Sequence, residues 1–212
     1  MSAGRSIISI SQDWCTPPKY VRAVREVFDG CIDLDPCSNC HSVVRAKVEY
    51  QIPQHDGLRC SWDCKTIYVN PPYGADRACG TTIKHWLRRC AKAHEDHGAE
   101  VLALVPVATN TNHWKLYVWG VATAVAFLYD TRLRFLVEGR DGGKGAPMSC
   151  AMVYWGSNFA RFDDVFLKFG AVVDLRDLHG KTIGVSPADA PMALFQALDE
   201  SGRDRRGGQK VV

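Results

Sequence analysis

The tetrapeptide Asn70-Pro71-Pro72-Tyr73 carries the sharpest chemical signal in this sequence. Two consecutive prolines fix the backbone and remove two amide donors, so the segment presents fixed carbonyl oxygens beside the side-chain carbonyl of Asn70. Tyr73 adds an aromatic face on which a flat ring can stack. Two such acceptors and an aromatic plate together suit the exocyclic amine of a planar base. The plain alternative is a turn that ends a strand, because Pro-Pro is common in turns.

The elements around this tetrapeptide indicate where it lies. Residues 66–69 form a β-branched and aromatic run, which is typical of a buried parallel strand. A shorter strand is expected over 31–36, and it ends in Asp33, Asp35 and Pro36. Because ligands of open parallel sheets bind at the carboxyl ends of the strands, both strand ends are expected to border one site.

The remaining hydrophobic pattern alternates between helical and strand periodicity. Further strands are expected over 101–105, 121–128, 132–136, 150–155 and 172–175. Helices are expected over 16–28, 77–93, 110–118, 159–169 and 188–197. This order predicts an α/β protein whose mostly parallel sheet is covered on both faces, with an antiparallel hairpin at its edge.

Length and composition limit the class of protein. The chain has 212 residues, of which 46% are hydrophobic and 23% charged, so it is expected to fold as one domain over 1–200 with a basic tail over 201–212. Its longest weakly polar run, 116–129, is shorter than the roughly 20 residues of a membrane span, and 1–11 does not resemble a signal peptide. We therefore expect a cytoplasmic protein without a membrane partner. The net charge of +3 permits a nucleic-acid partner but does not require one.

The nine cysteines are expected to be reduced, because an odd number cannot pair completely and no secretion signal is evident. Cys37 and Cys40, followed by Cys60 and Cys64, approach the spacing of a four-thiolate zinc site. The chain could thus be a zinc-stapled nucleic-acid-binding module without catalysis. Buried free thiols are the simpler interpretation, and we expect no metal.

Several other short motifs accompany this tetrapeptide along the chain. They are residues 14–18, 33–36, 56–58 with Trp62, 69–74, 105–106 with Trp114, 132–135 and 146–147. From about residue 12 to 156 the sequence resembles the phage-type DNA N-6-adenine methyltransferases. The resemblance implies a class I, Rossmann-like methyltransferase that uses S-adenosylmethionine and flips its target adenine out of DNA. One departure is that Pro36 to Asn39 replaces the glycine-rich cofactor loop of many such enzymes.

By this resemblance, Asn70 and the Pro71 carbonyl accept the hydrogens of the amine while Tyr73 stacks on the base. The residues that it implies for cofactor binding are Trp14, Thr16, Pro17, Asp33, Asp35, Pro36, Asp56 and Asn70. Asp35 is favoured over Asp33 for the methionine ammonium or a ribose hydroxyl. Asp56 would contact the adenine amine of the cofactor, or simply begin a turn with Gly57.

For DNA binding, Arg132 and Arg134 are expected on one strand face, where they reach phosphates or only line an exposed sheet edge. The loop 139–145 carries Arg140 and Lys144, which could enter a groove. We expect double-stranded DNA as the partner and no obligate protein partner. The resemblance also implies a bacterial host, a phage or prophage origin and a link to restriction and modification. A cytosine amine, an RNA base or a protein glutamine remain alternative targets of the same chemistry.

Overall fold

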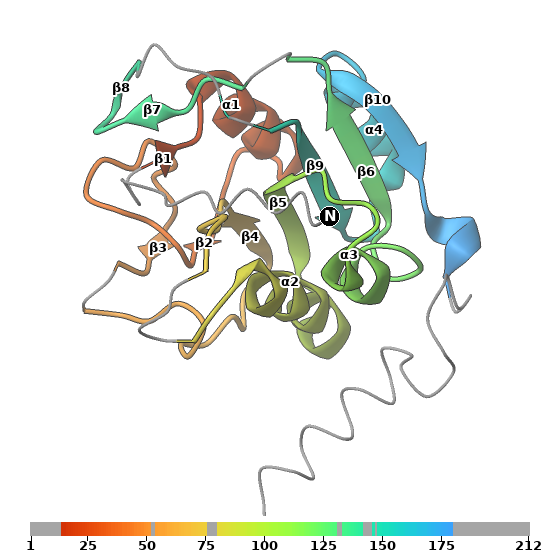
Figure 1. The fold of residues 1–212 in the computed structure, drawn as a ribbon, viewed down its shortest axis with the longest axis horizontal. Helices are drawn as coiled ribbons and strands as arrows, with labels where there is room; N and C mark the ends of the chain where they lie inside the picture. Colours follow the sequence, from red (N-terminus) through yellow and green to blue (C-terminus); the bar gives the residue numbers. More distant parts are fainter. Residues whose placement is uncertain are drawn as a thin grey trace, which may run out of the picture.

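The computed structural model describes residues 14–51, 54–75, 80–130, 133–141, 146 and 148–179. Its main sheet has seven strands in the order β10-β6-β9-β5-β4-β2-β3 (Figure 1). These strands are β2 (Leu34–Asp35), β3 (Val48–Glu49), β4 (Thr66–Val69), β5 (Glu100–Pro106), β6 (Ala124–Leu128), β9 (Cys150–Trp155) and β10 (Gly170–Asp174). The ladders from β3 to β5 are parallel, whereas β9 is antiparallel to β5 and β6, and β10 is antiparallel to β6. β2 to β6 therefore all run in one direction, and only β9 and β10 run against them. The chain is thus a mixed α/β protein with a large, mostly parallel sheet.

Helices cover both faces of this sheet, as the sequence predicts. Figure 1 shows α2 (Ile83–His97) and α3 (Asn112–Tyr117) in front of the sheet, with α1 (Pro18–Val27) and α4 (Phe159–Phe166) behind it. Alternate strand residues point to the two sides, so Tyr68 packs with α1 and α4 while Ile67 packs with α2 and α3. The two cores together remove the strands from water on both faces, which stabilises the sheet at about 25 cal/mol per Å² of buried apolar surface.

Local sequence explains where the helices begin and end. Pro18 occupies the first turn of α1, where its missing amide costs no hydrogen bond, and Gly30 follows the helix at φ 96°. In α2, Thr82 and His85 form a reciprocal capping box, and Gly98 ends the helix in the left-handed conformation at φ 64°. A short 3-10 helix, Arg176–Leu178, follows β10. Among the described residues, no helix is long and apolar enough to cross a membrane.

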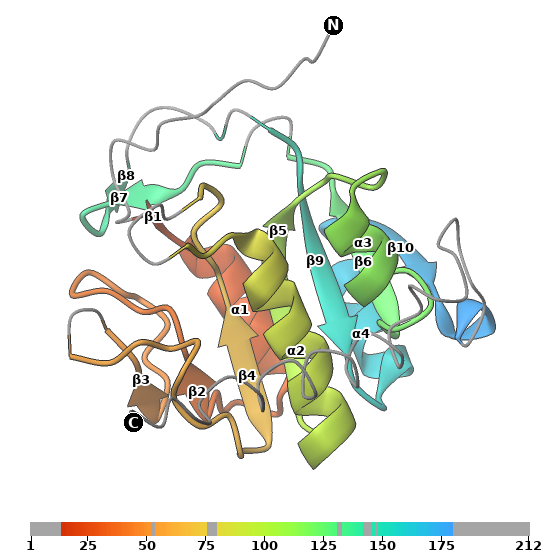
Figure 2. The ribbon, with the colours of Figure 1, turned by 60° about the horizontal axis from the view of Figure 1, so that its bottom comes forward.

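A second, small sheet lies beyond the carboxyl ends of β4 and β5 (Figure 2). It consists of β1 (Trp14–Cys15), β7 (Leu136–Val137) and β8 (Arg140–Asp141), in the order β1-β7-β8, with both ladders antiparallel. Glu138 and Gly139 turn the β7–β8 hairpin with positive φ angles of 52° and 74°. This sheet places β1 over the end of the main sheet where Asn70 follows β4.

The structure confirms most predicted elements and corrects three of them. Residues 66–69 and 150–155 form strands with the predicted bounds. The antiparallel hairpin was predicted at the wrong position in the sheet. β9 lies between β5 and β6, and the antiparallel strand at the edge is β10. The predicted strand over 132–136 is wrong within 133–135, because these residues have no regular structure. Their side chains nevertheless alternate as predicted, since Leu133 and Phe135 are buried and Arg134 is exposed. The predicted helix from residue 77 begins only at Ile83, after the capping box. The predicted helix 188–197 and the tail 201–212 lie outside the described residues.

Candidate active site

The connections of the main sheet define a switch point between β2 and β4. From β2 the chain proceeds to β3 on one side, and from β4 it proceeds to β5 on the other side. Ligands of open α/β sheets bind at the carboxyl ends of strands at such a point. Asp35 is the last residue of β2 and Asn70 directly follows β4, so the fold brings the two predicted strand ends to one place.

The side-chain amide of Asn70 is held from two sides. Its Nδ2 donates a hydrogen bond to the backbone carbonyl of Trp14 over 3.0 Å. Its Oδ1 accepts a longer bond of 3.4 Å from the hydroxyl of Tyr73. The amide is therefore oriented before any substrate arrives, and Oδ1 keeps a lone pair for a further donor.

Tyr73 lies in a cluster of three aromatic rings beside this amide. Its one hydroxyl proton is shared between Asn70 Oδ1 and the carbonyl of Leu104 on β5, which is 3.2 Å away. Burial raises the pKa of the phenol well above its ordinary value, so the ring is neutral. The Tyr73 ring meets Trp14 edge-on, with centroids 6.5 Å apart, and Phe135 at 5.8 Å, while Trp14 and Phe135 stack at 5.2 Å. Phe135 is a member of this cluster that was not predicted from the sequence, and only its place in the motif 132–135 could have indicated it.

Asp35 is a buried carboxyl group with a single hydrogen bond from the backbone. Only 4% of the residue is exposed, and its Oδ1 accepts a bond of 3.1 Å from the amide of Cys37. Burial raises the pKa of Asp35 to about 7, and the negative charge of Glu49 adds to this effect. The group is therefore poised to ionise when a positive charge enters beside it.

Asp33 occupies a different environment from Asp35. Its carboxylate forms an ion pair of 2.8 Å with Lys47 and accepts a bond of 3.1 Å from the amide of Thr66, the first residue of β4. The hydrogen bond from Lys47 holds the pKa of Asp33 below its ordinary value. Asp33 thus ties the amino ends of two strands, at the opposite end of β4 from Asn70.

The turn at Asp56 closes against the end of β2. Gly57 lies so close to the carbonyl of Pro36 that a Cβ atom on it would come within 1.7 Å of that oxygen. The indole of Trp62, which is buried, donates to the Gly57 carbonyl over 2.7 Å. The Asp56 carboxylate accepts the amide of Leu58, which is the pattern of a turn, yet the same contacts bring it to the strand end that carries Asp35.

The other residues predicted to contact the cofactor lie at the junction of β1 and α1. The hydroxyl groups of Thr16 and Tyr68 share a buried hydrogen bond of 2.7 Å, which ties this junction to β4. Pro17 is buried and forms the N-cap of α1. Of these three predicted residues, Trp14 contacts Asn70 directly, and Thr16 and Pro17 follow it at the start of α1.

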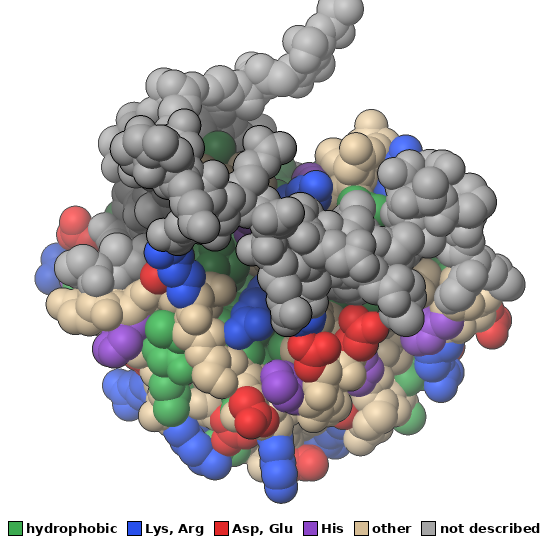
Figure 3. Space-filling view, turned by 90° about the horizontal axis from the view of Figure 1, so that it is seen from below, with side chains coloured by type: hydrophobic (Ala, Val, Ile, Leu, Met, Phe, Trp, Pro, Cys, Tyr) green, Lys and Arg blue, Asp and Glu red, His purple; other side chains and the backbone are tan. Residues whose placement is uncertain are grey.

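Two of the four predicted DNA-contacting residues are described. Arg134 and Arg140 are exposed, and Arg140 begins β8 of the small sheet. Arg132 and Lys144 lie outside the described residues. On the face seen in Figure 3, the described basic side chains are interspersed with acidic and histidine side chains, so the described residues form no continuous basic patch there.

The zinc alternative lacks a ligand cluster. The thiols of Cys37, Cys60 and Cys64 are partly buried and that of Cys40 is exposed, and all four are free. In the part of the chain that the structure describes, no group of three or more cysteine, histidine or acidic side chains is arranged to hold a metal ion.

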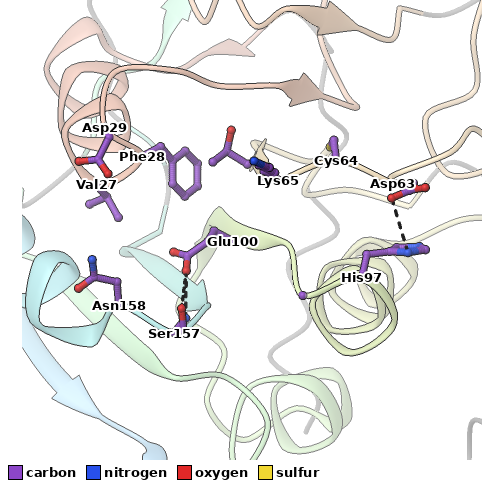
Figure 4. Close-up of a pocket in the computed structure, with 12 residues that line it drawn as sticks. Val27, Phe28, Asp29, Asp63, Cys64, Lys65, His97, Glu100, Ser157 and Asn158 are labelled. Carbon is purple, nitrogen blue, oxygen red and sulfur yellow. Dashed lines mark hydrogen bonds and ion pairs between the residues drawn. The ribbon is translucent and has the colours of Figure 1, made fainter.

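A separate open groove of about 510 Å³ lies at the amino edge of the main sheet (Figure 4). It is bordered by Thr66 at the start of β4 and Glu100 at the start of β5. Two pairs of its polar side chains contact each other, since Ser157 donates to Glu100 over 3.0 Å and His97 lies 3.9 Å from Asp63. This groove is at the far end of β4 from Asn70 and is not part of the candidate site.

Comparison with known proteins identifies the family of this chain. A family model described as DNA N-6-adenine-methyltransferase (Dam) matches residues 7–182, which includes every described residue. No curated protein and no solved structure gave a match.

Proposed function

We propose that this chain, which belongs to the DNA N-6-adenine-methyltransferase (Dam) family, transfers a methyl group from S-adenosylmethionine to an amine in DNA. The proposed target is the exocyclic amine of adenine in double-stranded DNA. The observation that carries the proposal is the Asn70 amide, held by Trp14 so that Oδ1 stays available beside an aromatic cluster. The family makes the chain a methyltransferase. The cofactor, the flipped base and the residue roles are our inference.

The residues at the strand ends fit the cofactor. S-adenosylmethionine carries a sulfonium and an ammonium group, and the buried carboxyl group of Asp35, which has no cationic partner among the described residues, is a natural partner for a cation. Asp35 would therefore hold the methionine ammonium. The Asp56 carboxylate, brought to Pro36 by the close approach of Gly57, would accept the adenine amine of the cofactor. When bound, the cofactor supplies an electrophilic methyl group.

The chain's own part in the reaction is to hold the target amine. A base inside a duplex must be extruded before its amine is accessible. The Asn70 Oδ1 and the Pro71 carbonyl would accept the two amine hydrogens, which draws the nitrogen lone pair out of conjugation with the ring and directs it at the methyl group. Tyr73, anchored through Leu104, would stack on the base, an interaction worth roughly 1–3 kcal/mol. Transfer is then a direct displacement, with no covalent enzyme intermediate.

A transfer assay tests the proposal. Purified protein, labelled S-adenosylmethionine and unmethylated DNA are incubated, and the DNA is digested to nucleosides that are separated by mass. We expect N6-methyldeoxyadenosine from the wild type, and we expect Asn70→Ala to lose turnover while it still binds the cofactor. Methylated cytosine would retain the mechanism and change the target. A fully active Asn70→Ala enzyme would refute the assigned role.

A further inference from the structure

We propose that Trp14 is a positioning residue that determines which end of the Asn70 amide faces the substrate. This inference rests on the proposed function, because it explains how the amide comes to present an acceptor. The two ends of an amide are nearly equal in size, but one donates and the other accepts. Only the oxygen end can receive the hydrogens of an amine, so a reversed amide would oppose the target with a donor.

The backbone carbonyl of Trp14 allows only one orientation. A carbonyl accepts hydrogen bonds and cannot donate them, so at 3.0 Å it selects the Nδ2 end of Asn70. The Tyr73 hydroxyl does not select the orientation, because a hydroxyl group can either donate or accept. Its one proton is shared between the Leu104 carbonyl at 3.2 Å and Oδ1 at 3.4 Å, so it occupies Oδ1 only weakly and leaves it open to the amine.

The position of Trp14 itself depends on the small sheet and on Phe135. The backbone of Trp14 pairs with Val137 on β7, and its indole stacks on Phe135 with an interplanar angle of 15°. Phe135 is 4% exposed and is packed into the core on the α1 side. Because Phe135 directly precedes β7, one short segment holds both the ring and the backbone of Trp14.

The amide orientation can be measured in the full-length protein without substrate or cofactor. The Asn70 side-chain NH₂ signal is identified in a ¹⁵N NMR spectrum by its loss in Asn70→Ala. In the wild type we expect this signal to exchange slowly with solvent, because one proton is bonded to Trp14. Trp14→Ala is expected to speed the exchange about tenfold, the effect of one lost hydrogen bond, and Trp14→Phe is expected to restore slow exchange.

Kinetics separate positioning from cofactor contact. For Trp14→Ala we expect kcat to fall about tenfold while the dissociation constant of S-adenosylmethionine stays unchanged. Phe135→Leu, which removes the stacking ring but keeps an apolar side chain, provides the same test if Trp14→Ala does not fold. Phe159→Ala is the matched control, because it removes a partly buried aromatic ring on α4 and should leave the Asn70 signal as it is.

The proposal is overturned if the Asn70 NH₂ exchanges equally fast in the wild type and in Trp14→Ala. It is also overturned if Trp14→Ala weakens cofactor binding and leaves kcat at saturating cofactor unchanged, which would make Trp14 a cofactor contact. Failure of the proposed function looks different: the wild type would methylate no DNA, whereas the exchange measurement would still report the amide orientation.

Discussion

Replacing Asp35 by asparagine should change the pH dependence of stability in the protein without cofactor, so that the variant gains on the wild type as the pH rises from about 4 to about 7. Burial raises the pKa of Asp35 to about 7, from 3.8 for an unperturbed group. Between these values the folded protein keeps the proton and the unfolded chain releases it. The stability that the protonated group provides is therefore complete below about pH 4 and is lost as the pH rises through 7. The asparagine side chain does not titrate, so the Asp35→Asn variant escapes this loss.

The size of the change in stability follows from the shift in the pKa of Asp35. Each pH unit in that window is worth 1.36 kcal/mol, so the advantage of Asp35→Asn over the wild type should grow by about 2 to 3 kcal/mol from pH 5 to pH 8. Urea unfolding of both proteins at the two pH values measures this change. Any fixed cost of the substitution cancels in the comparison.

Asp33→Asn is the matched control. The pKa of Asp33 is lowered, so this group is ionised in both folded and unfolded protein at pH 5 and above. Its effect on stability should be the same at pH 5 and pH 8. If the advantage of Asp35→Asn were also independent of pH, Asp35 would be ionised in the folded protein, and the reasoning from its burial would be wrong.

The same carboxyl group should make cofactor binding depend on pH. If only ionised Asp35 pairs with the ammonium of S-adenosylmethionine, a pKa of about 7 makes the dissociation constant about tenfold larger at pH 6 than at pH 8. Titration calorimetry at the two pH values checks this, and Asp35→Asn should bind weakly at both. Equal binding by the wild type at both values would exclude Asp35 as the partner of the ammonium.

Four further substitutions test other parts of the site. Tyr73→Phe should keep the stacking ring but cost about 1 to 3 kcal/mol of stability, because it leaves a carbonyl without its donor; unchanged urea unfolding would argue against that bond. Gly57→Ala should weaken cofactor binding by about tenfold or more, since its Cβ forces the turn away from Pro36; unchanged calorimetry would separate the turn from the cofactor site. Arg134→Ala and Arg140→Ala should each reduce the salt dependence of DNA binding by about one phosphate contact, and an unchanged slope would remove that arginine from the interface.

The sequence predicts the elements of this fold better than it predicts their neighbours. The bounds of β4 and β9 follow from runs that are apolar on both faces and that end in Pro or Gly residues. Such runs look alike wherever they lie in a sheet, so nothing local indicates that β9 enters between β5 and β6 rather than at the edge. Strand order is decided by long-range packing, which periodicity does not record.

The candidate site likewise combines residues that the sequence predicts with contacts that it does not predict. Asn70 and Tyr73 could be predicted because they belong to one contiguous motif, and Asp35 could be predicted from its place at a strand end. The hydrogen bond from Asn70 to Trp14 spans 56 positions, and the stacking on Phe135 spans more than twice that number, so neither has a local signal. The residue roles in methyl transfer are still predictions.

The central position of β9 has a consequence for how the chain can fold. β5 pairs with β9 from Val101↔Trp155 to Pro106↔Cys150, and the other edge of β9 pairs with β6. While the chain is being made, β5 and β6 are therefore both complete before the strand that joins them exists. Until Trp155 has left the ribosome, each presents an apolar, unpaired edge of the kind that aggregates. A product truncated before Cys150 should thus require chaperones, whereas one truncated after His179, which keeps the buried Leu175, should not.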